Sequence, residues 1–338
     1  MPVVPGDPVG AALRVLGERG QREVPLGPLT TYRVGGAAAV YVDASSLDDL
    51  RGVARAHAES GLPLLIIGRG SNLLIADEGF NGIAVAIGAA HDSIDIDEAS
   101  NRVTAGAGTL LPVLARRTAA AGWRGLEWAV GVPGSVGGAV RMNAGGHGSD
   151  VAHSLLTVTV ADLDRSADDI VLERPAAELG LRFRGSGLSA SSVVLDATFQ
   201  LRSGDRDAAE SEIAEIVAWR RANQPGGQNA GSVFVNPIPG ELSAGELIDR
   251  AGLRGWRHGS ASVSEKHANF IQADADGTAA DVRELMRIVR NRVEEQSGVR
   301  LRSEIRLIGF DQTRADGDHD AHNGDHHDNH DDNHVEVH

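Results

Sequence analysis

GVPGSVGGAVRMNAGGHG, at residues 131–148, carries seven glycines in 18 positions, with apolar side chains between them. Ordinary turns need one or two glycines, so this density indicates backbone packed closely against a large flat ligand or its pyrophosphate. Gly134, Gly137 and Gly138 fit neither the dinucleotide fingerprint G-x-G-x-x-G nor the phosphate loop G-x-x-x-x-G-K-[ST], and no lysine follows. The stretch therefore predicts a ligand-binding loop, with a purely structural glycine loop as the alternative.

A second glycine turn, GRGSNLL at 68–74, directly follows the apolar run LPLLII. Exposed backbone N–H groups in such a turn can form a nest for an anion, while Ser71 and Asn72 can add side-chain hydrogen bonds. A plain strand-ending turn uses the same residue types, and the motif alone favours such a turn over anion binding.

Around these loops, short β-rich runs alternate with helical stretches from Leu26 to about Leu201. Strands are expected at 37–44, 62–68, 82–88, 154–163, 169–175 and 191–202. A helix is expected at 47–60, capped by Ser45 and Ser46, and residues 101–122 look like a strand, a glycine turn and a helix. The layout is α+β, with glycines clustered at strand ends.

After Gly204 the pattern changes, and a second domain of about 105 residues is expected. Its helices are expected at 208–222, 243–251 and 278–297, and its strands at 261–264, 269–274 and 303–310. A short helical pattern also runs from Val9 to Leu16.

Residues 311–338 hold eight Asp, one Glu, one Arg and almost no apolar side chain. Such a segment cannot bury a core, so disorder is expected there. Its seven histidines, mixed with aspartates, would also suit Zn²⁺ or Ni²⁺, but their irregular spacing favours a solvated tail. No metal site is expected elsewhere.

The chain has 338 residues and a net charge of −15, which argues against nonspecific nucleic-acid binding because that needs a basic face. The absence of cysteine excludes disulfides, thiolate nucleophiles, cysteinyl flavin links and iron–sulfur clusters. No apolar run approaches the roughly 20 residues of a membrane helix, and the first ten residues lack the layout of a secretory signal. We therefore expect a cytoplasmic protein without a membrane partner.

Small polar clusters lie beside apolar segments further along the chain, at 182–186, 230–237, 264–270 and 301–309. Ser232 could donate a proton but lacks an adjacent base, and G-x-S-x-G is absent, which disfavours hydrolase chemistry. Glu304 has apolar neighbours on an expected strand, a setting that raises a carboxyl pKa and suits a general acid. By themselves, however, these residues favour an outward-facing glutamate on a strand. His267 by itself is more often structural than a ligand.

In their order and spacing, these motifs resemble the UDP-N-acetylenolpyruvoylglucosamine reductase (MurB) family, flavoenzymes of peptidoglycan precursor synthesis. The resemblance runs from about Glu23 to Phe310. It is carried by PLGPLTTYRVGGAAAVYV, GRGSNLLIADEGF, VTAGAGTLL, GLEWAVGVPGSVGGAVRMNAGGHG, AGSVFVNP, VSEKHANFIQ and GVRLRSEIRLIG.

The resemblance implies a two-subdomain FAD-binding fold of the vanillyl-alcohol-oxidase (PCMH) type, plus a smaller α+β domain that covers the flavin and binds a UDP-sugar. The expected divisions are an N-terminal extension at 1–21, FAD-binding subdomains at 22–88 and 89–205, the substrate-binding domain at 206–310 and the tail at 311–338. FAD would be bound non-covalently. The cofactor-binding residues that the resemblance implies are Gly68, Arg69, Gly70, Ser71, Asn72, Leu73, Gly131, Pro133, Gly134, Ser135, Gly137, Gly138, Asn143, Ala144 and Gly145.

The resemblance also implies the reaction and its residues. In the family, NADPH reduces FAD and leaves, the enolpyruvyl sugar takes its place, and hydride passes from flavin N5 to the β-carbon of the enol ether. Arg184 would pair with the substrate carboxylate, a protonated Glu304 would assist enolate stabilisation, and Ser232 would donate the proton to the α-carbon. Substrate contacts are implied for Asn236, Lys266, His267 and Asn269.

The sequence departs from the family at three positions. Phe183 stands where the family usually has Tyr, and Asn223 and Val235 stand where many members carry Lys. Because Lys266 is the single lysine of the chain, ligand affinity here would depend on it or on Arg220 and Arg221. Only 48 positions separate Arg184 from Ser232, which looks like the shorter family variant without an extra substrate loop.

Two other functions remain open. The first is another FAD-dependent oxidase or dehydrogenase of the same fold, against which AGSVFVNP and SEKHANF argue. The second is a binding protein that has lost turnover, which the missing lysines would suggest. We expect a monomer whose partners are a UDP-sugar and NADPH, with no nucleic acid.

Overall fold

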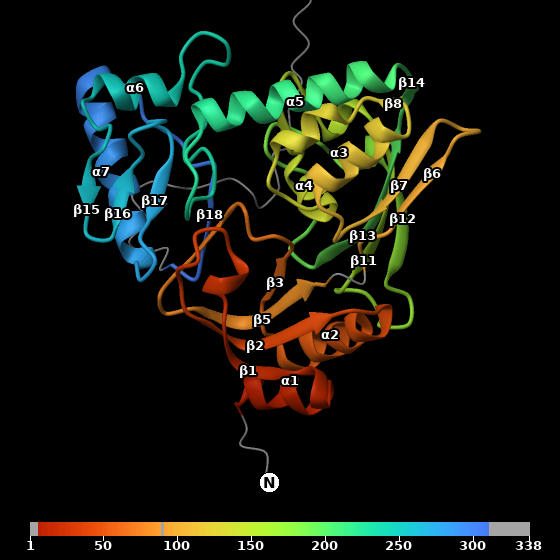
Figure 1. Cartoon of the computed structure of the whole chain (residues 1–338). Helices are drawn as coiled ribbons and strands as arrows, with labels where there is room; N and C mark the ends of the chain where they lie inside the picture. Colours follow the sequence, from red (N-terminus) through yellow and green to blue (C-terminus); the bar gives the residue numbers. More distant parts are fainter. Residues whose placement is uncertain (1–5, 89–90, 311–338) are drawn as a thin grey trace, which may run out of the picture.

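The structure is a computed structural model that describes residues 6–88 and 91–310. Figure 1 shows three parts: a small sheet flanked by helices, a larger sheet with helices beside it, and a C-terminal part of helices and short strands. The expected tail at 311–338, with its disorder and possible metal binding, lies outside the described residues, as do residues 1–5 of the expected N-terminal extension. Within the described ranges, no helix is long and apolar enough to cross a membrane.

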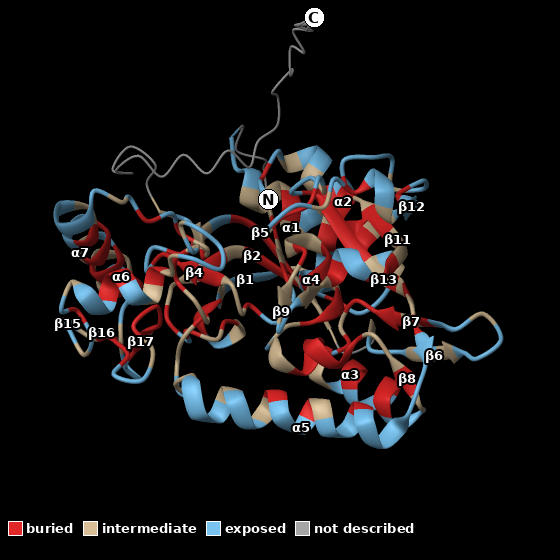
Figure 2. Ribbon diagram, turned by 90° about the horizontal axis from the view of Figure 1, so that it is seen from above, coloured by how far each residue is buried: buried red, intermediate tan, exposed pale blue. Residues whose placement is uncertain are grey.

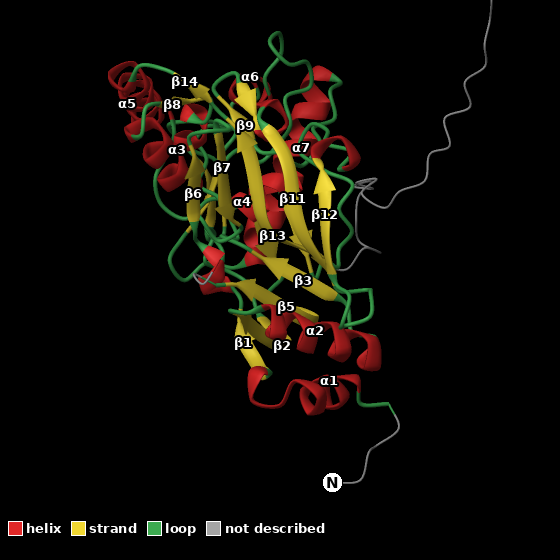
Figure 3. Ribbon diagram, turned by 90° about the vertical axis from the view of Figure 1, so that its right-hand side faces the viewer, coloured by secondary structure: helices red, strands yellow, loops and turns green. Residues whose placement is uncertain are grey.

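The first part is a four-stranded sheet in the order β1-β2-β5-β3, with two helices on one side (Figure 3). Its elements are α1 (Pro8–Leu16), β1 (Gln21–Pro25), β2 (Ala37–Ala44), α2 (Leu47–Ser60), β3 (Leu64–Ile67) and β5 (Phe80–Ile87). The α2 helix begins where Ser46 accepts the N–H of Asp49, and it ends at the left-handed Gly61. Ala12 and Leu16 of α1 are buried in the same core, so the expected extension is partly built into this unit.

The second part is a five-stranded antiparallel sheet in the order β12-β11-β13-β7-β6. Its elements and neighbours are β6 (Ile94–Asp97), β7 (Arg102–Gly106), α3 (Leu111–Ala120), β8 (Trp123–Arg124), α4 (Val136–Met142), β9 (Gly145–Gly146), β10 (Ser149–Asp150), β11 (Leu155–Asp162), β12 (Val171–Pro175), β13 (Ser192–Gln200) and β14 (Arg202–Ser203). The core of this part contains Trp123, Trp128 and Phe199.

The long helix α5 (Arg206–Asn223) packs on this second core. Its Ala209, Ile213 and Ile216 are buried with α3 and the sheet, while its outer face is exposed (Figure 2). The domain boundary expected before residue 206 would therefore separate α5 from the core that it packs against. The burial of α5 side chains in that core favours a domain boundary after Asn223 instead.

The C-terminal part has its own core and is tied to the first part. Its elements are α6 (Ala244–Arg250), β15 (Arg257–His258), β16 (Ala261–Val263), β17 (Ile271–Ala273) and α7 (Ala279–Ser297). Its last strand, β18 (Arg306–Ile308), pairs in parallel with β4 (Leu73–Ile75) of the first part. Asp77, just after β4, accepts the N–H groups of Ala279 and Ala280 at 2.8 and 2.9 Å and so caps α7. These contacts hold Glu304, two residues before β18, beside the loop that leads into β4.

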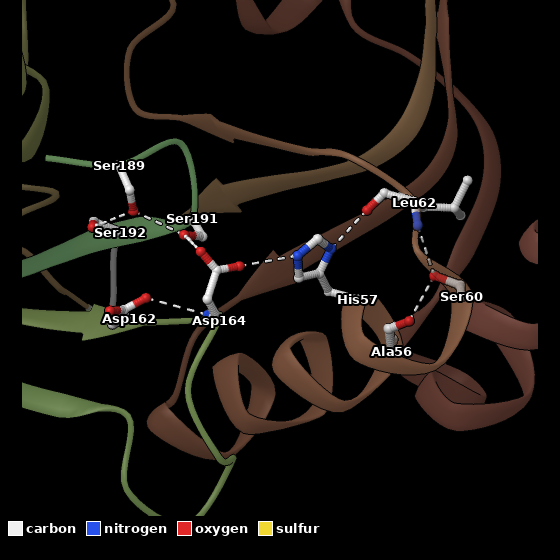
Figure 4. Close-up of polar contacts among 9 residues, drawn as sticks. All are labelled: Ala56, His57, Ser60, Leu62, Asp162, Asp164, Ser189, Ser191 and Ser192. Carbon is white, nitrogen blue, oxygen red and sulfur yellow. Dashed lines mark hydrogen bonds and ion pairs between the residues drawn. The ribbon is translucent and has the colours of Figure 1, made fainter. Parts of the chain in front are cut away.

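A polar cluster joins the first two parts (Figure 4). His57 on α2 lies between the Leu62 carbonyl, 2.7 Å from Nδ1, and Asp164 Oδ1, 3.1 Å from Nε2. Ser191 donates to the other oxygen of Asp164 at 2.5 Å. Because Asp164 lies between the serine and the histidine, His57 does not contact the Ser191 hydroxyl, and the three residues are not arranged as a nucleophilic triad. The cluster joins α2 to the loops that flank β11 and β13.

His57→Ala is expected to lower the free energy of unfolding by about 1 kcal/mol, because a partly exposed ion pair and a hydrogen bond are lost. Urea denaturation followed by circular dichroism measures this. His153→Ala, which removes a contact to Asp150 within a single turn, is the control and should change stability by less than half as much. Equal effects of the two substitutions would contradict a joining role for His57.

Candidate active site

Arg184 and Glu304, which are 120 residues apart in the chain, form an ion pair. Arg184 Nε donates to Glu304 Oε1 at 2.5 Å, and Nη1 donates to the Gly145 carbonyl at 3.2 Å. The guanidinium carbon also lies 5.2 Å from the ring centroid of Phe183. With Nε and one hydrogen of Nη1 engaged, the outer edge of the guanidinium still has donors for an anion.

Glu304 is fixed by its own backbone. Its N–H donates to the Val233 carbonyl at 2.8 Å, and its carbonyl accepts from the Asn72 side chain at 3.0 Å. The Asn72 carbonyl in turn accepts from the N–H of Arg306 at 3.0 Å. Glu304 therefore lies where the loop at 68–72 meets the segment that follows Ser232.

Burial raises the pKa of the Glu304 carboxyl above its ordinary value, and the neighbouring Arg184 charge and hydrogen bond oppose the rise. The side chain is 14% exposed, so it is not the outward-facing strand residue that the sequence left open. A carboxyl in this setting is more readily protonated near neutral pH than an exposed glutamate.

Ser232 precedes a short stretch that pairs with the strand-like residues before β18. Val235 donates its N–H to the Arg302 carbonyl at 2.9 Å, and Phe234 and Ser303 form a bridge. Because Val233 is the residue that accepts from Glu304, the backbone of Ser232 is one residue from that contact. The Ser232 hydroxyl is half-buried and has no hydrogen-bond partner among the described residues.

The Asn269 side chain holds this stretch through two bonds to the backbone of Phe234. Its Oδ1 accepts the Phe234 N–H at 3.0 Å and its Nδ2 donates to the Phe234 carbonyl at 2.8 Å, with the residue 3% exposed. These bonds give Asn269 a positioning role for the stretch, and the substrate contact expected for it stays a prediction. A sequence motif cannot reveal this, because the amide can face backbone or ligand equally well.

The other three expected substrate residues lie around the same segment. Asn236 is exposed, and its Oδ1 accepts from Ala244 at the start of α6. The Lys266 amine donates to the Arg221 carbonyl at the end of α5. His267 Nδ1 accepts the N–H of Asn269 at 3.2 Å, and burial, followed by the Arg254 charge, lowers its histidine pKa.

The two glycine loops lie against each other. A Cβ on Gly68 would come 2.7 Å from Ser135 Oγ, and that buried hydroxyl has no hydrogen-bond partner among the described residues. At Gly70 the backbone is left-handed, and a Cβ would come 2.2 Å from the Leu29 carbonyl. In the described ranges, the N–H groups of the turn at 69–71 donate to no acceptor.

The second loop contributes differently from the first, because part of it is the short helix α4. The N–H groups of Val136 and Gly137 donate to the carbonyls of Thr109 and Ala107, both at 2.9 Å. Gly137 is needed for this approach, since a Cβ there would come 2.9 Å from the Ala107 Cβ. Gly134 also donates internally, to Val132, whereas the buried Ser135 hydroxyl has no partner among the described residues.

Residues Asn143 to Gly145 shape the Arg184 side of the site. Asn143 has a left-handed backbone, and its side chain bonds to Asp150, the N–H of Ala152 and the carbonyl of Arg182. Ala144 donates its N–H to Ala139, and Gly145 presents its carbonyl to Arg184. The Asn143 side chain is therefore occupied by protein groups and positions the loop that carries Arg184.

The remaining residues expected to bind the cofactor differ in how far they are exposed. Leu73 is buried in β4, so its side chain belongs to the core. Arg69, Pro133 and Gly138 are exposed, and Ser71, Asn72 and Gly131 are half-buried. An unpaired buried hydroxyl, glycines without room for a Cβ and unpaired N–H groups fit the pyrophosphate of a dinucleotide such as FAD.

Comparisons with known proteins agree with this arrangement. Residues 38–165 match the family described as FAD binding domain, and residues 223–308 match the family described as UDP-N-acetylenolpyruvoylglucosamine reductase, C-terminal domain. The second match begins at Asn223, the last residue of α5. It agrees with the boundary that packing favours.

Full-length relatives give the same result. UDP-N-acetylenolpyruvoylglucosamine reductase of Heliobacterium modesticaldum is 42% identical over 304 residues, which cover 88% of this chain and 94% of that protein. The namesake from Bacillus velezensis is 36% identical over 288 residues, covering 84% and 92%. The crystal structure of the MurB protein from Thermus caldophilus has a TM-score of 0.72 and 34% identity, and covers 85% of this chain and 98% of that one. The expected α+β fold with an FAD-binding region is confirmed, and this chain belongs to the UDP-N-acetylenolpyruvoylglucosamine reductase family.

Proposed function

We propose that the protein uses FAD and NADPH to reduce UDP-N-acetylglucosamine enolpyruvate to UDP-N-acetylmuramate. The observation that carries the proposal is the Arg184–Glu304 pair, held where the loop at 68–72 meets the Ser232 segment. A guanidinium beside a partly buried carboxyl is suited to stabilise an enolate next to a carboxylate. When bound, FAD would take a hydride from NADPH and, once reduced, would supply the hydride that adds to the β-carbon of the enol ether.

Arg184 is the group that would bind the substrate carboxylate. Glu304 and the Gly145 carbonyl fix two of its nitrogens, so the guanidinium is oriented before any ligand arrives. Its charge would also stabilise the enolate that develops on the adjacent carbon. Phe183 is 61% exposed, so the Tyr-to-Phe departure removes a hydroxyl from an open position beside this arginine.

Glu304 and Ser232 would handle the proton. A protonated Glu304 can donate a hydrogen bond to the enolate oxygen while its other oxygen keeps the contact with Arg184. The Ser232 hydroxyl would give its proton to the α-carbon, which completes the reduction of the double bond. An alcohol is a weak acid, so this step depends on the charge stabilisation that Arg184 and Glu304 provide.

The pH dependence follows from the raised pKa of Glu304. As pH rises through that pKa, the carboxyl loses its proton, and the rate of flavin reoxidation by the enolpyruvyl sugar is expected to fall. Glu304→Gln keeps a neutral donor and an acceptor for Arg184, so it should retain more activity than Glu304→Ala. Stopped-flow rates between pH 5 and 9 test this, and an unchanged alkaline fall in Glu304→Gln would contradict the assignment.

A different FAD-dependent oxidase or dehydrogenase is the alternative function. It would discharge reduced flavin rapidly to O₂ and would not respond to the enolpyruvyl sugar. A binding protein without turnover would show neither reaction. Steady-state NADPH oxidation that requires the enolpyruvyl sugar, with a product two hydrogens heavier by mass spectrometry, supports the reductase. Fast O₂-dependent turnover without the sugar supports the oxidase.

The preference for NADPH, the monomeric state and the cytoplasmic location stay predictions.

A further inference from the structure

Arg184 is held in a strained turn. Its φ is +55°, a left-handed backbone conformation that residues other than glycine rarely adopt. Across the turn, Arg182 and Gly185 exchange N–H to carbonyl bonds at 3.0 and 3.1 Å, which fixes the shape of the turn. A strained conformation of this kind persists only where the surrounding structure holds it. Bonds within the turn do not set its place beside Glu304, so contacts from outside the turn must do so.

Arg141, in the last turn of α4, contacts the segment that follows this turn at several points. Its Nη2 donates to the carbonyl of Ser189 at 2.9 Å and to the carbonyl of Ser192 at 2.5 Å. In return, the Arg141 carbonyl accepts from the Ser186 hydroxyl at 2.8 Å. Both ends of the segment 186–192 are therefore tied to α4, and the segment begins two residues after the arginine of the active site.

The two residues whose carbonyls Arg141 binds are themselves well fixed. The Ser189 hydroxyl lies 2.8 and 2.9 Å from the hydroxyls of Ser191 and Ser192, and Ser191 donates to Asp164 (Figure 4). Ser192 is also the first residue of β13. Arg141 therefore fastens the segment to the larger sheet and to the polar cluster that joins the first two parts.

The Arg141 guanidinium is a half-buried charge that bonds to backbone carbonyls alone. Among the described residues, no carboxylate lies within ion-pair distance of it. Burial, followed by the Arg306 charge, lowers the Arg141 pKa to about 10, so the side chain is still charged at neutral pH. Withdrawing a charge from water without a carboxylate partner is costly, and the carbonyl contacts offset part of that cost. A planar guanidinium suits this arrangement, because its N–H groups point to several acceptors at once.

We propose that Arg141 is a positioning residue that places Arg184 for binding the substrate carboxylate. The chain after α4 also presents the Gly145 carbonyl, which accepts from Arg184 Nη1. One short helix would thus hold the backbone of the active-site arginine through Arg141 and its guanidinium through Gly145. The inference rests on the proposed function, in which Arg184 binds the carboxylate of the enolpyruvyl group.

The first test compares two ligands that differ in the carboxylate. The enolpyruvyl sugar and UDP-N-acetylglucosamine, which lacks the enolpyruvyl group, are titrated calorimetrically into the oxidised, FAD-loaded protein. Arg141→Gln is expected to weaken binding of the enolpyruvyl sugar about tenfold, the loss of one oriented charge-assisted contact. Binding of UDP-N-acetylglucosamine should stay within twofold, whereas a general loosening of the fold would weaken both ligands alike.

The second test asks whether Arg141 acts through Arg184. Arg141→Gln is expected to slow reoxidation of reduced FAD by the enolpyruvyl sugar by about 10²-fold, the effect of misplacing a reacting group by about 1 Å. Reduction of FAD by NADPH should change less than twofold. In the Arg184→Lys background, where the oriented guanidinium is already lost, adding Arg141→Gln should slow reoxidation little further.

Two further variants keep the tests interpretable. Arg165→Gln is the matched control, because the Arg165 guanidinium also bonds to a backbone carbonyl in the second part, that of Asp169 at 2.8 Å. It should leave both affinities and both rates unchanged. Ser186→Ala removes the other bond between the segment and α4, and should cause the same selective loss at about fivefold. Unfolding temperature and FAD content show whether each variant is folded, and Ser186→Ala decides the matter if Arg141→Gln is not.

Several outcomes would overturn the positioning role. These are equal losses for the two ligands, unchanged binding of the enolpyruvyl sugar, or fully additive effects of Arg141→Gln and Arg184→Lys. Failure of the proposed function would look different, because the unaltered protein would then neither bind nor reduce the enolpyruvyl sugar.

Discussion

Ser232→Ala is expected to slow the reoxidation of reduced FAD by the enolpyruvyl sugar by about 10³-fold, the range for loss of a positioned proton donor. The backbone at Ser232 is held by Asn269 and by the contact between Val233 and Glu304, and neither involves the hydroxyl. Removing the hydroxyl should therefore leave the segment in place. The measurement is anaerobic stopped-flow absorbance of the flavin after mixing with the sugar.

The two half-reactions give this prediction an internal control. Reduction of FAD by NADPH does not use the serine proton, so its rate should change less than twofold in the same variant. Ser262→Ala, on β16 of the same domain, should leave both rates close to those of the unaltered protein. Reoxidation that is as fast in Ser232→Ala as in Ser262→Ala would show that another group donates the proton.

Gly70→Ala is expected to weaken FAD binding by a large factor. Gly70 has φ near +59°, and an added Cβ would come 2.2 Å from the Leu29 carbonyl and 2.7 Å from Thr30 Cα. Both contacts are with backbone, so the loop at 68–72 must move and carry Asn72 away from Glu304. Fluorescence titration with FAD is expected to show affinity at least about 100-fold weaker, which corresponds to about 2.8 kcal/mol.

Gly61→Ala is a matched control for the conformational part of that effect. Gly61 is also left-handed, with φ near +66°, but an added Cβ would meet nothing within 4 Å. It should lower the free energy of unfolding by about 1 kcal/mol and leave FAD affinity unchanged. If Gly70→Ala bound FAD as Gly61→Ala does, the loop at 68–72 would not be the cofactor loop.

Much of the fold could be predicted because local pattern and burial agree. The strand at Ala37–Ala44 and the helix at Leu47–Ser60 occur where alternation, helical period and a serine cap indicated them. The missed strand Gln21–Pro25 has mostly exposed, charged or polar residues, so it carries no apolar signal. This strand forms because its backbone pairs with that of β2.

The glycine-rich stretch was harder to interpret. Two adjacent glycines disfavour a helix, and the stretch reads as a loop, yet Val136–Met142 is helical. Burial of Val136 and Val140, together with close approach to Ala107 that only glycine permits at position 137, overrides the propensity.

The contact between Arg184 and Glu304 could not be predicted from local sequence either, because the two residues are far apart in the chain. Sequence patterns mark Arg184 and Glu304 separately, but their contact depends on pairing between β4 and β18 and on Asn72, which no local pattern encodes. Asn269 shows a different limit. Its sequence motif indicated a contact with the substrate, whereas its side chain bonds to the backbone of Phe234. The role of each expected residue in binding FAD or substrate stays a prediction.

The most direct measurement of the central claim is an anaerobic titration of the FAD-loaded protein. One equivalent of NADPH is added first, the flavin absorbance band is recorded, and UDP-N-acetylglucosamine enolpyruvate follows. We expect bleaching by NADPH and recovery of the band with one equivalent of the sugar. Bleaching without recovery would contradict the reductase and favour the oxidase, and a protein that takes up no FAD would contradict the assignment of both glycine loops.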